Sequence, residues 1–483
     1  MSGESISPVD LAWLRMDRPT NPMVIVAVLI LGDPLSHARL KAVLGRRLLT
    51  FERFLDRPVC EALGGGHWQR ATDFHLDAHL RRLKLPPRAG QTQLEAAASR
   101  LASTPLDPER PLWQFHLVEH YGKGSAIIGR VHHCYADGVA LMRVLLSLTS
   151  AGPGDLPPAS PPVTQSTNDT STGPWSLLAP ITDVLGSAGT LVQRAIETTA
   201  SVLNTSLQTL AHPSQAATLV QQTAEATREL AKIALLPEDP PTAFKGQLSR
   251  HKQVSWAEPL SFSEVRTVAR ALGCTINDVL LATVAGAFGA YLESCGNEID
   301  SLTLKALVPV NLRPSDQTPR LGNEFGLVFA SLPVGERNPL ARVYAVHRDM
   351  ETLKHSSQAI VAFWLLTAMG LLPGIIEQQV IELFTTKASA VISNVPGPRE
   401  PLYLAGARIE RQFFWVPQAG GIGVGISLLT YDGAVHFGVM ADRHLIPHPK
   451  QIAARFIVEF ERLLMQVLAG ALSTASRPSA RTP

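Results

Sequence analysis

The chain has 483 residues, of which 45% are hydrophobic and 17% are charged, and its 43 Lys and Arg nearly balance its 41 Asp and Glu. This length and hydrophobic content exclude general disorder, and the charge balance argues against a surface devoted mainly to polyanions. The low charge and the mean hydropathy of +0.10 fit either a large core or a protein that handles apolar material.

The cysteines show neither the spacing of a zinc site nor that of a disulfide framework. They lie at Cys60, Cys134, Cys274 and Cys295, without a CxxC pair. Residues 1–17 lack a basic segment followed by an apolar core and a small-residue cleavage site. We therefore expect a cytoplasmic protein in a reducing compartment.

The first region, residues 1–150, has strand and helix patterns in alternation. Val24–Leu31 and Ala126–Val131 are apolar runs that predict buried strands, and Val139–Leu148 predicts a helix. Such alternation is typical of an α/β layer structure.

The middle of the chain differs in composition. Residues 151–173 are rich in Pro, Gly, Ser and Thr and predict a flexible linker. Residues 174–236 are rich in Ala, Leu and Thr, and the prolines up to Pro241 end this pattern, so 174–241 is predicted to be a helical crossover. The alternative is an amphipathic patch that rests on a lipid surface.

The third region, residues 242–470, again predicts mixed helix and strand, before a disordered tail over 471–483. Ser261 to Glu264 resembles a capping box for a helix that ends at Gly273, and Thr275 to Asp278 resembles a second helix start. Asp432-Gly433 lies between the apolar runs 424–430 and 435–439 and predicts a hairpin.

A charge-free stretch, Ser356 to Ile376, approaches the length of a membrane span. Gly370, Pro373 and Gly374 interrupt it, and a Pro-Gly pair should end a helix. A buried or interfacial helix is therefore predicted in place of a span.

The sharpest chemical pattern is His132-His133-Cys-Tyr-Ala-Asp137-Gly138, where an apolar strand gives way to a helix. If the strand persists through both histidines, their rings point to opposite faces, which argues against a shared metal ion. One ring facing a cavity and one buried ring would suit a single general base. Asp137 could cap the helix, and Gly138 permits a tight backbone. The alternative is two core histidines without a catalytic role.

The motif resembles the HHxxxDG signature of CoA-dependent acyltransferases, the superfamily of chloramphenicol acetyltransferase and peptide-synthetase condensation domains. Further segments resemble the bacterial and plant wax ester synthase/diacylglycerol acyltransferase family and occur in its order. They are Ser7 to Asp10, Asn21 to Met23, Pro105 to Asp107, Arg110 to Trp113, Asn277-Asp278, Val308 to Arg313, Gly322 to Gly326, Ser393 to Pro398, Tyr431 to Gly433 and Ala441 to Arg443.

This resemblance implies an α/β fold of two chloramphenicol-acetyltransferase-like subdomains with a tunnel between them. It assigns His133 as general base within the catalytic set of His132, His133 and Asp137. It also implies acyl-CoA as co-substrate, no other cofactor or metal, and a fatty alcohol or diacylglycerol as acceptor. The expected location is the cytoplasm, with peripheral contact to the inner membrane face or lipid inclusions, and nucleic acid is not an expected partner.

Other candidate substrate-binding residues are Gly138, Asn277, Asn394 and Trp113. Asn277, near a helix start, could donate to an oxyanion or merely cap the helix. The segment around Asn394 is predicted to be a rigid turn, and Trp113 could line the tunnel or belong to the core. Arg313 and Arg443 are the candidate partners of Asp137.

Three alternatives stay open. The same fold could acylate an amine or a carrier-bound or polyketide hydroxyl, because Cys134 and Tyr135 are bulkier than expected within the motif. A non-catalytic protein could coat lipid inclusions through the helical middle. A metal-dependent hydrolase could use His132, His133 and Asp137.

Overall fold

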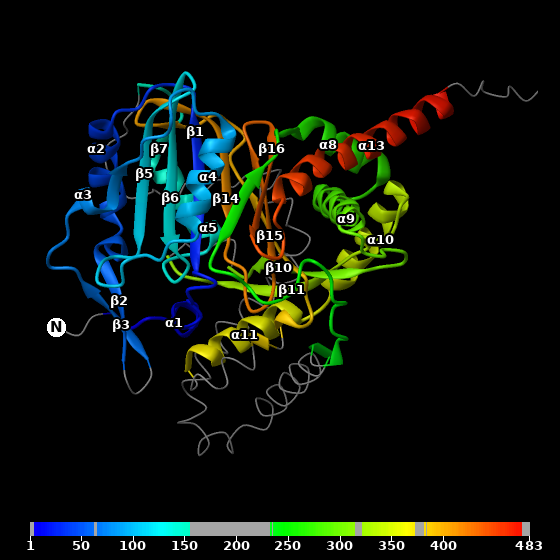
Figure 1. Cartoon of the computed structure of the whole chain (residues 1–483), viewed down its shortest axis with the longest axis horizontal. Coiled ribbons are helices and arrows are strands. Elements are labelled where there is room, and N and C mark those ends of the chain that lie inside the picture. The colour runs from blue at the N-terminus through cyan, green and yellow to red at the C-terminus, as the bar shows by residue number, and fades with distance from the viewer. Residues whose placement is uncertain are drawn as a thin grey trace, which may run out of the picture.

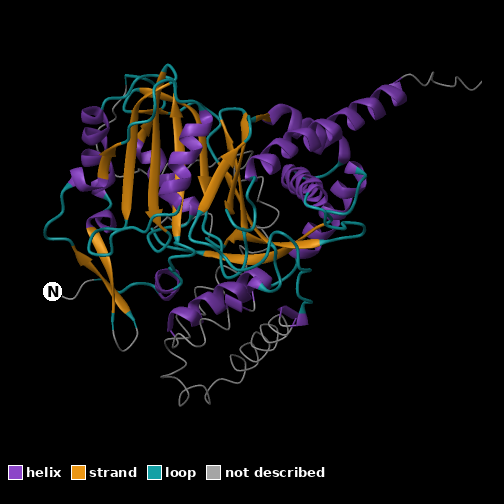
Figure 2. Cartoon of the chain, in the orientation of Figure 1, coloured by secondary structure: helices purple, strands orange, loops and turns teal. Residues whose placement is uncertain are grey.

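Two β-sheets stand side by side in the computed structural model, each flanked by helices (Figures 1 and 2). The structure describes residues 4–61, 65–154, 232–233, 235–313, 321–371, 381–382 and 384–475. Most of the predicted linker, most of the helical crossover and residues 476–483 of the predicted tail lie outside these ranges.

The first sheet has the strand order β4-β5-β6-β1-β14-β13-β7. Its strands are β1 (Val24–Leu31), β4 (Leu80–Arg82), β5 (Trp113–Tyr121), β6 (Gly124–His132), β7 (Thr149–Ser150), β13 (Tyr403–Leu404) and β14 (Ala407–Trp415). A separate pair is formed by β2 (Asp56–Cys60) and β3 (Gly66–Arg70).

The second sheet has the order β11-β10-β12-β15-β16-β8, and β9 also pairs with β16. Its strands are β8 (Lys252–Trp256), β9 (Leu260–Ser261), β10 (Leu304–Asn311), β11 (Phe325–Leu332), β12 (Ala390–Pro396), β15 (Val424–Tyr431) and β16 (Ala434–Asp442).

Helices cover both sheets. Those near the first sheet are α1 (Pro8–Arg15), α2 (His37–Arg47), α3 (Leu76–His79), α4 (Gln91–Ala102) and α5 (Gly138–Leu148), with 3₁₀ turns at Leu48–Thr50 and Glu52–Leu55. Those near the second sheet are α8 (Phe262–Leu272), α9 (Ile276–Ser294), α10 (Pro339–Lys354), α11 (Gln358–Leu371) and α13 (Pro449–Ala475).

Strand β1 shows why the first sheet carries helices on both faces. Its eight residues are all apolar, so neither face can be left to solvent. Val24, Val26 and Val28 pack in one cluster with α4, whereas Leu29, on the other face, joins the cluster that contains α2 and α5.

The two halves exchange structure, so the predicted division at residues 150 and 242 does not match the sheets. β14 comes from the C-terminal region but pairs with β1 along its length, from Val26–Trp415 to Leu31–Ile409. In return, α4 of the N-terminal region packs on β8 at the edge of the second sheet. Each sheet therefore depends on residues from the other half.

Most local predictions are confirmed. The first strand is β1, the predicted helix is α5, and Thr275 with Asp278 forms a reciprocal capping box at α9. Gly273 ends α8 in the left-handed conformation, and Asp432 and Gly433, both with positive φ, turn β15 into β16.

Three local predictions are wrong. Ser261 precedes α8, but its hydroxyl bonds Ser263 Oγ at 2.7 Å and does not cap the helix. Residues 471–475 were predicted to belong to a disordered tail. They form the end of helix α13, which continues to Ala475. Asn394 lies in strand β12 and not in a turn.

Residues 358–371 of the apolar stretch form α11, in agreement with the predicted helix, whereas Pro373 and Gly374, which were predicted to end it, lie outside the described residues. Gly370 does not interrupt it, because α11 runs to Leu371. A Cβ at Gly370 would lie 1.7 Å from Pro8 O, so the glycine allows α1 to pack directly against α11. In the described part of the chain no single helix has the length and hydropathy to cross a membrane, although the bent pair α8 and α9 passes that test together.

Candidate active site

The HHxxxDG motif lies where β6, in the middle of the first sheet, leads into α5. β6 ends at His132, and residues 133–135 form a turn. The strand does not continue through both histidines, because His133 lies outside it. The expectation that the strand turns the two rings to opposite faces therefore does not apply. Both side chains are buried, with residue exposures of 1% for His132 and 4% for His133, so the expected difference in exposure is not seen. Their surroundings differ instead.

His132 has one hydrogen-bonded ring nitrogen, and its other ring nitrogen, which has no hydrogen-bond partner among the described residues, lies near a carboxylate. Nδ1 accepts a hydrogen bond from Cys134 N at 3.2 Å, and Nε2 lies 3.5 Å from Asp17 Oδ2. Asp17 also accepts a hydrogen bond from Met23 N at 3.1 Å. This ring therefore fixes the turn and the loop before β1.

His133 has aromatic surroundings and a free ring nitrogen. Its ring stacks on Trp13 of α1 at 4.0 Å between centroids and 15° between planes, with Phe325 at 5.8 Å. Among the described residues, Nδ1 has no hydrogen-bond partner. Burial lowers the pKa of His133 to about 4, so the imidazole is neutral near pH 7 and can accept a proton.

The backbone of His133 is tied to the C-terminal region through Asn323. Asn323 Nδ2 donates to His133 O at 2.8 Å and to Asp10 Oδ1 at 2.7 Å. Burial raises the pKa of Asp10 to about 6, although these hydrogen bonds and Arg53 oppose the shift. The sequence placed Asp10 and Asn323 in family-like segments but gave neither a role, and Trp13 carried no signal of its own.

Asp137 caps α5 and pairs with Arg313, one of its two candidate partners. Its Oδ1 accepts from Ala140 N at 2.9 Å, and its Oδ2 lies 2.6 Å from Arg313 Nη1 and accepts from Glu324 N at 3.1 Å. Arg443 lies elsewhere, in a separate groove between the two halves. The aspartate therefore joins the motif to the loop between β10 and β11.

Asn277 and Asn394 are brought together by the fold, although they lie far apart in the sequence. Asn394 Nδ2 donates to Asn277 Oδ1 at 3.0 Å. The neighbouring Val395 lies against Gly138, where an added Cβ would be 3.2 Å from Val395 Cγ2. Because successive side chains of a strand point to opposite faces, the amide pair lies on the other face of β12 from this contact.

Trp113 and the bulky motif residues belong to the core of the first half. Trp113 is fully buried, donates from Nε1 to Phe54 O at 2.8 Å and stacks on His79. Tyr135 is also fully buried, and its hydroxyl donates to Asp56 O at 2.6 Å. Burial raises the pKa of Cys134, so its thiol stays protonated. Cys134 and Tyr135 therefore enlarge the core beneath the motif.

Three hollows lie around the motif region; of the motif residues only Gly138 lines one of them, and neither His132 nor His133 lines any of the three. An apolar cavity of about 130 Å³ lies between α5 and the first sheet and reaches Gly138. A cavity of about 790 Å³ is lined by residues 4–10, residues 51–53 and residues 321–324, with Phe363 and Thr367 of α11. A groove of about 1040 Å³ lies between α4, β8 and the start of α13 and includes Pro19. The second hollow approaches His133 through Asp10 and Asn323. The third approaches His132 through the loop that carries Asp17.

One group of possible metal ligands occurs in the described residues, away from the motif histidines. Cys274, Asp278 and His347 bring one ligand atom each within 4.8 Å of one another. Asp278 Oδ2 already accepts hydrogen bonds from Thr275 N at 2.9 Å and His347 Nδ1 at 2.8 Å. This carboxylate therefore serves the start of α9.

Comparisons with solved structures identify the fold. A wax ester synthase/diacylglycerol acyltransferase from Marinobacter aquaeolei VT8 superposes with a TM-score of 0.67 and 20% identity, over 96% of this chain and 99% of that one. The first condensation domain of the CDA synthetase gives 0.58 and 15%, over 96% of each chain. At these identities the likeness establishes the two-subdomain α/β fold, as predicted.

Sequence comparisons identify the family. A protein of Mycobacterium tuberculosis named as a diacylglycerol O-acyltransferase is 29% identical over 422 residues, 85% of this chain and 84% of the relative. A Mycobacterium bovis protein of the same description is 28% identical over 95% of this chain and 98% of its own length. The family model for the wax ester synthase/diacylglycerol acyltransferase catalytic domain matches residues 6–280, and that for the C-terminal domain of the family matches 321–464. The chain therefore belongs to the wax ester synthase/diacylglycerol acyltransferase family of acyltransferases.

Proposed function

We propose that this acyltransferase moves a long-chain acyl group from acyl-CoA to the hydroxyl of a fatty alcohol or diacylglycerol, in one step with both substrates bound. His133 is the general base. The observation that carries this assignment is the surroundings of the two motif histidines: His132 Nδ1 accepts from Cys134 N and its Nε2 lies 3.5 Å from the Asp17 carboxylate, whereas the His133 ring stacks on Trp13 and its Nδ1 has neither a hydrogen bond nor a carboxylate partner among the described residues. No metal or other cofactor takes part in the proposed mechanism.

The proton balance follows from a neutral imidazole. His133 takes the proton of the acceptor hydroxyl as the oxygen attacks the thioester carbonyl carbon. When the carbon–sulfur bond breaks, the imidazolium returns that proton to the departing CoA thiolate. The lowered pKa of His133, about 4, favours this return and equally makes the neutral ring a weaker base for the first proton transfer.

Asn277 is the proposed donor to the oxyanion that forms on the carbonyl. Because Asn394 donates to Asn277 Oδ1, the Asn277 amide is oriented with its NH₂ group left to donate. Asp137 and Arg313 act by positioning, since they fix the start of α5 and the loop that carries Asn323.

The proposal uses the two larger hollows for two substrates. His133 is only 4% exposed, so both substrates must reach it past its bonded neighbours. The hollow beside α1 and α11 suits the acceptor because it is partly apolar. Trp364 on α11 is 38% exposed, and we propose that this side meets a membrane or lipid inclusion, from which a water-insoluble acceptor would enter.

The test compares His133→Gln with His132→Gln. The parent should form ester and release CoA when given palmitoyl-CoA with hexadecanol or dipalmitoylglycerol. His133→Gln should lower kcat by about 10²–10⁴-fold, the usual contribution of a general base. His132→Gln should mainly lower the free energy of unfolding. Its effect on the kcat of the folded fraction should be small. Equal activity of parent and His133→Gln would refute the assignment.

The same assay distinguishes the alternative functions. Supplying a fatty amine or an acyl-carrier hydroxyl in place of the alcohol tests acceptor class. Lipid binding without CoA release, unchanged in His133→Gln, would instead indicate a non-catalytic coat protein.

A further inference from the structure

The apolar cavity between α5 and the first sheet, here called the α5 cavity, is bordered by one polar side chain. Gln412 of β14 lines it, and every other lining residue that the structure describes is apolar or glycine. Helix α5 contributes Gly138, Leu141, Met142, Val144, Leu145 and Leu148. One amide therefore borders a hollow that is otherwise built of hydrocarbon groups.

The lining of this cavity extends along one face of the first sheet, from the motif to Gln412. At one end, Ile25 of β1 pairs with Val131, the residue before the motif. At the other end, Leu29 of β1 pairs with Gln412. Residues two or four apart on a strand share a face, so these pairs lie on the same side of the sheet.

Small residues in the middle of this face leave room for the cavity. Ala27 of β1 pairs with Gly129 of β6, and both line the hollow. Ala27 is the one residue of β1 that is not fully buried, although its strand has a neighbour on each side. The hollow therefore follows from the choice of small residues in two central strands.

The amide of Gln412 lacks a partner, although its backbone is well held. The residue is 2% exposed, and Nε2 has no hydrogen-bond partner in the described part of the chain. Its backbone pairs with Leu29, and Gln412 O lies 2.9 Å from His436 Nδ1. A buried N–H group without a partner destabilises a folded protein, because it has lost its hydrogen bonds to water. A leucine at this position would avoid that cost.

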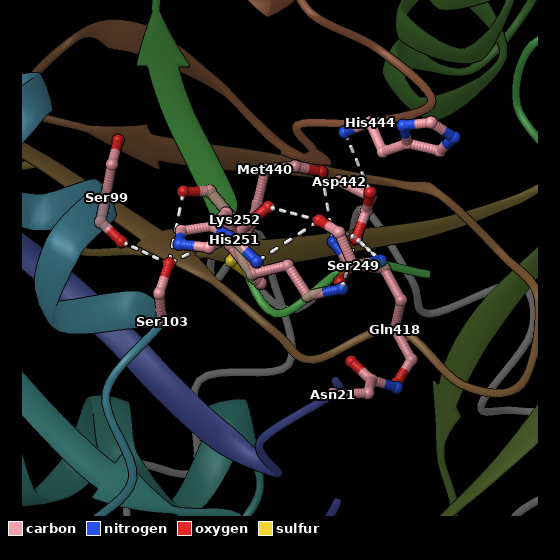
Figure 3. Close-up of polar contacts among 10 residues, drawn as sticks. All are labelled: Asn21, Ser99, Ser103, Ser249, His251, Lys252, Gln418, Met440, Asp442 and His444. Carbon is pink, nitrogen blue, oxygen red and sulfur yellow. Dashed lines mark hydrogen bonds and ion pairs between the residues drawn. The ribbon is translucent and has the colours of Figure 1, made fainter. Parts of the chain in front are cut away.

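A second buried glutamine in the same region shows the usual arrangement. Gln418 is 1% exposed, and its Nε2 donates to Met440 O at 3.0 Å (Figure 3). Nearby, the buried Lys252 lies 3.4 Å from Asp442 Oδ2 (Figure 3). These donor groups have protein partners, whereas Gln412 Nε2 has none among the described residues.

Water is a poor partner for this amide. A buried water molecule typically makes about three hydrogen bonds, and an apolar cavity of about 150 Å³ stays dry but can bind benzene. The α5 cavity has a volume of about 130 Å³ and offers the side chain of Gln412 as its polar group. It is therefore suited to a segment of a hydrocarbon chain, and an oxygen atom on that chain would satisfy the amide.

We propose that the α5 cavity receives part of a substrate hydrocarbon chain and that Gln412 hydrogen-bonds to an oxygen atom carried on that chain. The chemical class is an oxo- or hydroxy-substituted chain. The NH₂ group of the amide donates to a ketone or hydroxyl oxygen, and its carbonyl oxygen accepts from a hydroxyl. Gln412 is thus a specificity-determining residue, and the inference rests on the proposed function, which supplies the long-chain substrates.

The acyl chain is the expected source of this chain segment. The cavity reaches Gly138 at the start of α5, so a chain attached to a group that reacts at the motif could enter there. The hollow beside α1 and α11 is already proposed for the acceptor. The chain of the acceptor is the second possible source, and the experiment distinguishes the two.

The test compares kcat/KM for palmitoyl-CoA with kcat/KM for oxopalmitoyl-CoA donors that carry a ketone at successive chain carbons. A ketone cannot itself be acylated, so hexadecanol stays the acceptor in every assay. In the parent, one ketone position should give a kcat/KM about tenfold higher than that of palmitoyl-CoA, because the ketone meets the amide only there. Other positions should be used less well than palmitoyl-CoA, because their ketone is buried without a donor.

Gln412→Leu removes the amide at nearly constant size. In this variant the preferred ketone position should disappear, and palmitoyl-CoA should become the better donor at every position. Met142→Leu is the control, since Met142 lines the same cavity and its replacement changes shape without changing polarity. It should keep the preference for a ketone. An unchanged preference in Gln412→Leu would overturn the inference.

A second series distinguishes the source of the chain. It uses palmitoyl-CoA with oxohexadecanols as acceptors. If Gln412→Leu abolishes a ketone preference only in this series, the chain in the cavity belongs to the acceptor, and the role of Gln412 stands. A parent without a ketone preference in either series would show that the inference is wrong.

Thermal unfolding without substrate gives a readout that does not depend on catalysis. Gln412→Leu should leave the Tm unchanged or raise it, because the amide has no partner to lose. Gln418→Leu is the matched control and should lower the Tm, because Met440 O loses its bond to Gln418 Nε2. If Gln412→Leu and Gln412→Met both lower the Tm as much as the control does, the amide serves the fold and the inference is wrong.

Failure of this inference and failure of the proposed function give different results. If the parent forms ester from palmitoyl-CoA and hexadecanol but shows no ketone preference, the inference alone fails. If the parent uses no thioester with any of these alcohols, the proposed function fails, and the inference falls with it.

Discussion

Arg313 Nη1 lies 2.6 Å from Asp137 Oδ2, and both side chains are almost completely buried. Arg313 also donates to Gly322 O at 2.8 Å, so one guanidinium links the start of α5 to the loop that carries Asn323. The two halves of the site are therefore joined by a buried ion pair. If one partner is removed, the charge of the other partner stays buried without compensation.

We expect Arg313→Met to lower the free energy of unfolding by roughly 3–5 kcal/mol, because Asp137 would stay buried without its partner. Denaturant unfolding measures this loss. Arg337→Gln, which breaks exposed pairs with Glu293 and Asp300, should cost less than about 1 kcal/mol. If both substitutions cost the same, the buried pair does not have the proposed positioning role.

Trp13 should matter for catalysis because it fixes one face of the His133 ring. Trp13→Leu is expected to lower kcat about tenfold with the KM for acyl-CoA unchanged, and Trp13→Phe should recover part of the loss because a flat ring remains. Trp415→Leu is the control, since Trp415 is also buried but packs with Trp256 and Phe413. Steady-state kinetics on the folded fraction would contradict the idea if the two leucine variants behaved alike.

Asp10 and His133 should give stability opposite dependences on pH. The pKa of Asp10 rises to about 6 from 3.8, so its contribution is present at low pH and is lost as pH rises from about 4 to 6. The pKa of His133 falls to about 4 from 6.5, so its contribution is complete above pH 6.5 and is lost as pH falls toward 4. Each shift corresponds to roughly 3 kcal/mol.

Unfolding of the parent, Asp10→Asn and His133→Gln between pH 4 and 7 measures both contributions. The stability of the parent relative to Asp10→Asn should fall as pH rises, and its stability relative to His133→Gln should increase. The other titrating groups contribute equally to the stability of parent and variant, so their contributions cancel in each difference. Two differences that change in the same direction would show that one assignment of protonation is wrong.

Asn277→Asp should harm catalysis more than substrate binding. The new carboxylate would place negative charge where the oxyanion develops, so kcat should fall by about 10²-fold or more. Asn394→Ala removes the hydrogen bond that orients Asn277 and should give a smaller loss. Asn297→Asp, on the turn after α9, serves as the control for the same chemical change. Equal kcat in parent and Asn277→Asp would remove Asn277 from the mechanism.

The sequence predicted most elements whose cause is local. The all-apolar β1, the reciprocal cap of α9 and the Asp-Gly turn after β15 each depend on a few neighbouring residues, and each was found. The cap at Ser261 failed because a neighbouring hydroxyl, on Ser263, offered Ser261 Oγ another partner. The motif itself was recognisable because its residues are contiguous.

What the sequence by itself determined was the α/β class, the motif, the family resemblance and the types of residue available for chemistry. Only the tertiary structure decided that β14 completes the first sheet, that Arg313 and not Arg443 meets Asp137, and that Trp13 stacks on His133. These contacts join residues far apart in the chain, and their geometry depends on how both sheets pack. No local pattern carries that information, because the partner that stabilises a buried charge or ring is chosen by the whole fold.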